Sequence, residues 1–284
     1  MRTVVAGVDL TVLGRRVADR ARIVAETTGS TLKLLHILEP VSEALIEPSH
    51  ARLMHGYQKG LAEDLAAWCE ERSSAQVELE VVKGSPSWEL VSRSKGAQLT
   101  VVGSSTIEAF ALGPTARRVA RMASNHILVV RRQPRVPYRR ILVAVDFSDA
   151  SRVAVDTAMS MFPEAELTVV YSLPSRFDPI LAEAGLFIEE LDADRDRRLE
   201  LAGDRMAEFV HGFDTDLRSV VLDGPTLETI DEAVRRRNAD LLVAGSRGAT
   251  ATRMVLLGNV AEGLLSTAPC DVMIARVPST FRRP

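Results

Sequence analysis

Three glycines in the last quarter of the chain have a spacing that suits the binding of an anion. Gly245 and Gly248 are followed by nine residues and then by Gly258. The apolar run 240–244 predicts a buried parallel strand before them, and the run 260–265 predicts a helix after them. Glycine lets backbone N–H groups approach an anion closely, and a helix start adds unpaired N–H donors and a positive dipole end. The segment therefore predicts a loop that cradles phosphate.

The strands and helices that would position this loop occur twice along the chain. Two prolines in segment 133–137 predict an extended linker between the copies. The sequence thus predicts two domains, residues 1–133 and residues 138–284, and 284 residues are enough for both. The matched segments are 3–9 with 141–146, 31–36 with 166–171, 81–86 with 221–225, 97–103 with 239–245, and 126–131 with 271–276.

Each half alternates short apolar runs with helical segments, which predicts five strands and four helices. The β-α-β alternation implies a parallel sheet that is covered on both faces. The predicted fold class is therefore α/β, with two tandem open five-stranded parallel sheets flanked by helices. One helix in each half carries an apolar stripe expected in the core: Leu53, Tyr57, Leu61, Leu65 and Trp68 in the first, and Leu199, Ala202, Met206, Phe209 and Phe213 in the second.

Ligands of open parallel sheets bind outside the carboxyl ends of the strands. The first strand of the second half ends at Asp146, and Asp9 has the same place in the first half. The Asp146 carboxylate can accept hydrogen bonds from a ribose or from the amine of a base. The alternative is a helix cap or a turn residue, and the residues alone leave both open.

The composition excludes several classes of function. Apolar residues make up 46% of the chain and charged residues 26%, as in soluble globular proteins, and the net charge of −3 gives no case for nucleic acid or an anionic membrane. No apolar run reaches the ~20 residues that span a bilayer. Cys69 and Cys270 lie far apart, which predicts a reduced, cytoplasmic chain, and the five scattered histidines predict no structural metal.

The second half resembles the universal stress protein family in its tandem two-domain form. The strand 141–146 leads into Phe147 and Ser148, the glycine motif follows, and segment 268–272 comes after it. The resemblance covers nearly the whole chain, once in each half. It implies a Rossmann-like fold of the adenine nucleotide alpha hydrolase type. It also implies an adenine nucleotide at the motif loop, which is ATP, ADP or AMP, with or without Mg²⁺.

The resemblance also implies which residues contact the nucleotide. The family motif ends in Gly-Ser or Gly-Thr, whereas this chain has Asn259, whose side chain can still donate and cap the helix. Ser172 falls where the family often has an apolar residue against the adenine. Arg247 and Arg253 can add charge-assisted hydrogen bonds to phosphate, or can belong to a solvated loop. Ala144, Val145 and Asp146 would lie by the adenosine, and Gly245, Gly248, Gly258, Asn259 and Val260 would line the phosphates.

The first half keeps the leading glycine of the loop but changes the rest. Thr106 stands at the second glycine position after Gly103, and only six residues separate it from Gly113. Pro114 then removes a backbone N–H that an anion would use, and Glu108 adds negative charge. Arginines on the next helix offset part of this charge, so a different anion stays an alternative. We expect one nucleotide site in the second half and a degenerate site in the first.

These observations favour an adenine-nucleotide-binding stress or signalling module with little or no catalysis. The alternative is a structural or interaction protein that binds no nucleotide, and slow ATP hydrolysis is a third hypothesis. The sequence contains no Walker motif, dinucleotide fingerprint or nucleophile elbow, which argues against an enzyme with a defined substrate.

The last predicted strand of each half is apolar and would leave an exposed edge. In the family this strand pairs two domains about a two-fold axis. The resemblance therefore implies that segments 127–130 and 272–275 pair within the chain as a pseudo-dimer, and that two chains can associate further as a homodimer.

Overall fold

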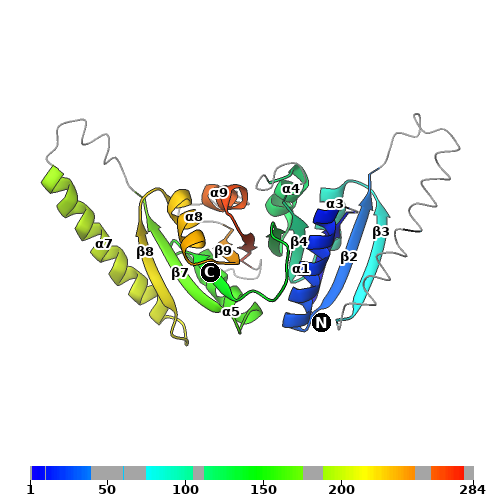
Figure 1. The fold of residues 1–284 in the computed structure, drawn as a ribbon, viewed down its shortest axis with the longest axis horizontal. Coiled ribbons are helices and arrows are strands. Elements are labelled where there is room, and N and C mark those ends of the chain that lie inside the picture. Colours follow the sequence, from blue (N-terminus) through cyan, green and yellow to red (C-terminus); the bar gives the residue numbers. More distant parts are fainter. Residues whose placement is uncertain are drawn as a thin grey trace, which may run out of the picture. The chain divides into compact units, whose positions relative to one another are not determined.

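The structure is a computed structural model that describes residues 2–9, 11–39, 60, 75–104, 112–174, 188–246 and 257–277. The chain divides into two compact units, Met1–Pro137 and Tyr138–Val277 (Figure 1). Within the described residues, no helix has both the length and the apolar character needed to cross a bilayer.

The first unit contains a parallel sheet in which the strands follow the order β3-β2-β1-β4-β5. Helix α1 packs against β1 and β4, and helices α3 and α4 pack against each other. The strand order reverses direction between β1 and β4, which places a binding crevice at their carboxyl ends. The strands are β1 (Thr3–Val8), β2 (Thr31–Leu38), β3 (Val77–Lys83), β4 (Leu99–Gly103) and β5 (His126–Val130), and the helices are α1 (Val12–Thr28), α3 (Pro86–Arg93) and α4 (Pro114–Met122).

The second unit repeats this arrangement, with parallel strands in the order β10-β9-β6-β7-β8. The corresponding reversal lies between β6 and β9. The predicted α/β fold class is therefore confirmed. The strands are β6 (Arg140–Ala144), β7 (Glu166–Leu173), β8 (Arg218–Asp223), β9 (Leu241–Gly245) and β10 (Asp271–Ala275), and the helices are α5 (Asp149–Met161), α7 (Ile188–His211), α8 (Thr226–Arg236) and α9 (Asn259–Thr267).

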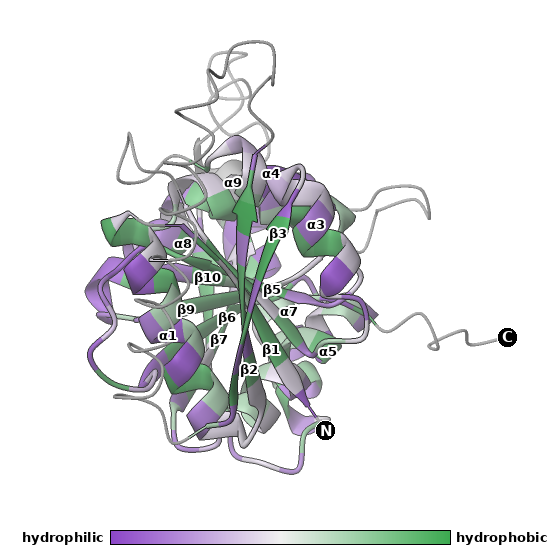
Figure 2. Cartoon of the chain, turned by 90° about the vertical axis from the view of Figure 1, so that its right-hand side faces the viewer, coloured by the Kyte–Doolittle hydropathy of each residue, from purple (hydrophilic) through white to green (hydrophobic). Residues whose placement is uncertain are grey.

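The central strands form the core of each unit because both of their faces are covered. All five residues of β10 are buried, as are the first four of β9, and Figure 2 shows the apolar character of the strands. Of the five residues predicted to form the apolar stripe, Ala202, Met206 and Phe209 on α7 are buried. Leu199 and Phe213 are only half-buried, and Phe213 lies beyond the end of α7 at His211. The equivalent stripe from Leu53 to Trp68 lies outside the described residues.

A buried hydrogen bond joins the start of the second unit to its last strand. The Tyr138 hydroxyl donates to Oδ2 of Asp271 at 2.7 Å, and the Asp271 side chain has no exposed surface. Burial of a carboxylate is unfavourable unless it accepts hydrogen bonds, so this contact fixes Tyr138 against β10. Cys270, next to it, is buried and forms no disulfide within the described residues, and its thiol donates to Asp271 O at 3.3 Å. Cys69 lies outside the described residues.

The Glu80 carboxylate on β3 gives the first unit a defined pH dependence. Its two oxygens form ion pairs with Lys33 Nζ at 2.6 Å and with Arg93 Nη1 at 2.6 Å. The hydrogen bond from Lys33, with the charges of Lys33 and Arg93, lowers the pKa of Glu80, although partial burial acts in the opposite direction. A carboxyl group with a lowered pKa stabilises the fold above its unfolded pKa, and this contribution is lost as the pH falls through the folded pKa.

We therefore expect Glu80→Gln to lower the free energy of unfolding at pH 7 by a few tenths to about 1 kcal/mol, because the ion pairs are partly exposed. The difference from the wild type should shrink towards pH 3. Urea unfolding at both pH values measures it. Glu78→Gln, on the same strand but exposed and unpaired in the described part of the chain, is the control. An equal effect of Glu80→Gln at both pH values would contradict a lowered pKa of Glu80 in the folded protein.

Candidate functional site

The connection from β6 to α5 forms one side of the candidate site in the second unit. Oδ1 of Asp146 accepts hydrogen bonds from the Ser148 N–H at 3.2 Å and from the Ser151 hydroxyl at 2.7 Å. Ser148 is the N-cap of α5, and its Oγ accepts from the Ser151 N–H at 3.3 Å. Asp146 therefore holds the turn together, as one of the two interpretations of the sequence predicted, and it is not itself the cap. In the first unit, Asp9 accepts from Thr11, the N-cap of α1, in the same way.

Phe147 is a feature of this turn that sequence reasoning missed. Its φ is +64°, in the left-handed region that residues other than glycine seldom adopt. The ring centroid lies 4.5 Å from that of Tyr171 and 5.6 Å from that of Phe209, and the Arg205 guanidinium carbon lies 4.8 Å from the centroid. These contacts hold the strained backbone beside Asp146. The sequence carries no signal for them, because they depend on where α7 packs.

The residues expected near the adenosine follow two adjacent parallel strands. Ala144 and Val145 are buried, and the Val145 N–H continues the β6–β7 ladder by donating to Val170 O at 2.9 Å. Ser172 on β7 is also buried. Its hydroxyl donates to Gly224 O at 3.2 Å and lies 2.9 Å from Thr229 Oγ1. The Ser172 side chain is therefore directed to the connection between β8 and α8, where its hydrogen bonds are satisfied.

The loop after β9 is closed at its base by the backbone of Ser246. The Ser246 N–H donates to Ala275 O at 3.0 Å, and its carbonyl accepts from the Gly258 N–H at 2.9 Å. Its hydroxyl is buried and has no hydrogen-bond partner among the residues that the structure describes. Sequence reasoning did not select Ser246. The other predicted loop residues, Arg247, Gly248 and Arg253, lie outside the described residues.

The start of α9 differs from the sequence-based expectation in one respect. Gly258 is the N-cap, with φ −76° and ψ 156°, and Asn259 is the first helical residue, without a side-chain cap bond. The expectation that the Asn259 side chain caps the helix is therefore wrong, because the chain becomes helical one residue earlier. Since the Gly258 N–H is used by Ser246, Gly258 can approach an anion but cannot donate to it. Asn259 and Val260, both exposed, carry the next N–H groups of the helix start.

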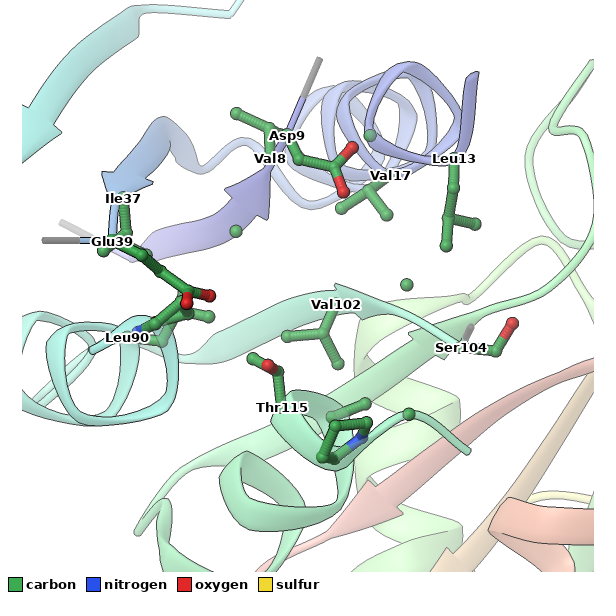
Figure 3. A pocket seen from close by; sticks show the side chains of 17 residues that line it. Val8, Asp9, Leu13, Val17, Ile37, Glu39, Leu90, Val102, Ser104 and Thr115 are labelled. Atoms are coloured by element: carbon green, nitrogen blue, oxygen red, sulfur yellow. The ribbon is translucent and has the colours of Figure 1, made fainter. Parts of the chain in front are cut away.

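The first unit has a cavity of about 350 Å³ at the corresponding place (Figure 3). Its base is closed in the same manner, because the Ser104 carbonyl accepts from the Gly113 N–H at 2.9 Å. Pro114 is the first residue of α4, as predicted, so this helix start has one N–H fewer than that of α9. In neither unit do the described residues gather three His, Cys, Asp or Glu side chains that could hold a metal ion.

Comparisons with known proteins match both halves of the chain to one family. The model of the universal stress protein family matches residues 1–131 and again residues 137–276. A universal stress protein from Methanocaldococcus jannaschii is 30% identical over 145 residues, which are 50% of this chain and 84% of that protein.

Two solved structures share the fold over nearly the full length. One is a universal stress protein from Archaeoglobus fulgidus, with a TM-score of 0.68, 17% identity, and coverage of 98% of this chain and 97% of that chain. The other is a protein of unknown function from Pseudomonas aeruginosa, with a TM-score of 0.65, 19% identity, and coverage of 97% and 92%. Since the family model accounts for most of each half, the chain belongs to the universal stress protein family, in a tandem two-domain form.

Proposed function

We propose that the second domain binds one adenine nucleotide at the carboxyl ends of β6 and β9. The chain would serve as a stress-response or signalling module with little or no catalysis. The observation that carries the proposal is the start of α9, where exposed residues Asn259 and Val260 carry backbone N–H groups without intrahelical partners. Such a helix start attracts phosphate through its donors and its dipole.

The phosphates would contact the loop between β9 and α9. Asn259 and Val260 would donate backbone hydrogen bonds, and the buried Ser246 hydroxyl, which lacks a partner among the described residues, could add a donor. Arg247, Gly248 and Arg253 would complete this part of the site. A Mg²⁺ ion would be held chiefly by the phosphates of the nucleotide.

The adenosine would lie against the end of β6, by Ala144, Val145 and Asp146. A carboxylate can accept several hydrogen bonds, so Asp146 could bind a ribose hydroxyl while it keeps the turn bonds to Ser148 and Ser151. The adenine base would lie against Ser172, whose hydroxyl already forms hydrogen bonds with Gly224 and Thr229. Ser172 would therefore contribute packing more than a new hydrogen bond.

Mass spectrometry of the purified, unheated protein tests the proposal. We expect an adenine nucleotide to copurify with the wild type and to be lost from Gly248→Val, because branched side chains obstruct close approach of the backbone to phosphate. Thr106→Val, the matched change in the first domain, should retain the nucleotide. Absence of nucleotide from the wild type, with no binding on addition of ATP, ADP or AMP, would instead favour a structural or interaction protein.

A further inference from the structure

The cavity of the first domain has the size of a small-molecule site. It lies at the carboxyl ends of β1, β2 and β4, and its volume of about 350 Å³ falls within the range of ligand pockets. Figure 3 shows Asp9, Glu39, Ser104 and Thr115 around the cavity, each from a different segment of the chain. Apolar side chains form much of its wall: Leu13, Val17, Ile37, Leu90 and Val102.

Among the described residues that line this cavity, the charged groups are all negative. Asp9 and Glu39 line it, and none of the described lining residues is basic. Oδ1 of Asp9 accepts hydrogen bonds from Thr11, whereas Glu39 makes no ion pair or hydrogen bond within the described part of the chain. Two carboxylates without a cationic partner repel a phosphate and attract a cation.

The cavity also has few donors for an anion. The helices α3 and α4, which both begin at its wall, start with Pro86 and Pro114, and neither has a side-chain cap bond. Each proline removes one N–H from a helix start. The Gly113 N–H is used by the Ser104 carbonyl. The features that favour phosphate at α9 are therefore reduced here.

The hydroxyl of Ser104 is a separate feature of the cavity that can contact a polar group of a ligand. Ser104 is 5% exposed and lines the cavity, yet its hydroxyl has no hydrogen-bond partner among the described residues. Unlike that of Ser246, the Ser104 hydroxyl oxygen is not among the fully enclosed polar atoms without a partner, so it can be reached from the cavity. A ligand N–H or O–H would satisfy the Ser104 oxygen.

We propose that the first domain binds a small organic cation, which is an ammonium group on a compact apolar body, in place of a nucleotide. The ammonium group would be attracted by Asp9 and Glu39, and the apolar body would contact Leu13, Leu90 and the other apolar wall residues. This inference goes beyond the proposed function, which concerns the second domain, and its test does not depend on nucleotide binding.

Ligand-observed NMR and calorimetry on the full chain test the binding of a cation with three probes of similar shape. Phenethylammonium is the cation, 2-phenylethanol is its uncharged analogue, and phenylacetate is the anion. We expect the cation to bind roughly tenfold more tightly than the alcohol, as one charge-assisted hydrogen bond would give, and phenylacetate not to bind. Saturating ATP should leave the affinity for the cation unchanged.

Two variants locate the binding. Glu39→Gln should weaken binding of phenethylammonium roughly tenfold, with unchanged thermal unfolding because Glu39 is exposed. Glu78→Gln, an exposed carboxylate outside the cavity, should bind like the wild type. The proposal is overturned if no cation binding is detected at millimolar concentration, if Glu39→Gln has no effect, or if phenylacetate or adenosine displaces the cation with similar or higher affinity.

Discussion

Asn259→Pro should weaken nucleotide binding by roughly 10- to 100-fold and leave the fold intact, because one hydrogen bond to a charged group contributes about 1.5–3 kcal/mol. Asn259 is the first residue of α9, a position where the fixed φ of proline suits the helix. Pro114 occupies the same position of α4 in this chain. The substitution thus removes one N–H from the proposed phosphate contact without breaking a helical hydrogen bond. Calorimetric titration with ATP measures the affinity.

Asn259→Ala separates the backbone contribution from that of the side chain. It keeps the N–H and removes the amide, which makes no cap bond. We expect Asn259→Ala to stay close to the wild type in ATP affinity, and both variants to unfold at the wild-type temperature. Equal loss of affinity in the two variants would show that the Asn259 side chain, not the helix N–H, contacts the nucleotide.

Gly245→Ala should lower the free energy of unfolding by about 1–3 kcal/mol, the usual effect of overpacking a dense core. A Cβ at Gly245 would lie 2.8 Å from the carbonyl oxygen of Ala150 and 2.9 Å from its carbonyl carbon. Because these are backbone atoms in the first turn of α5, relief requires movement of the helix start. That movement would also displace the turn at Asp146, so nucleotide affinity should fall as well.

Gly103→Ala, the equivalent change in the first domain, is the matched control. There a Cβ would lie 2.7 Å from Cγ of Leu13 and 2.8 Å from Cδ2. A side chain can rotate away, whereas the backbone of a helix cannot, so we expect a smaller loss of stability. Urea unfolding of both variants measures the difference. A loss for Gly103→Ala as large as that for Gly245→Ala would contradict the role given to Ala150.

The fold was predictable because its signal is local and repeated. Apolar runs such as 240–244 recur in both halves, and buried parallel strands produce such runs wherever helices cover both faces. The stripe on α7 was predictable for a similar reason, since its spacing alone directs Met206 and Phe209 to the core.

The details of the site were less predictable, because they depend on where the chain changes conformation and on what packs nearby. The helix begins after Gly258 and not after Asn259, a difference of one residue that decides which N–H is available. The left-handed backbone of Phe147 depends on the rings of Tyr171 and Phe209, and the unpartnered hydroxyl of Ser246 depends on burial. The pairing of segments 127–130 and 272–275 stays a prediction.

The number of nucleotides bound per chain tests the central claim most directly. Calorimetric titration of the full chain, freed of any copurified ligand, with ATP should give one site. That site should be weakened by Asn259→Pro and unaffected by Thr106→Val. Two equivalent sites per chain would contradict the asymmetry between the domains, and no binding at all would contradict a nucleotide site at the start of α9.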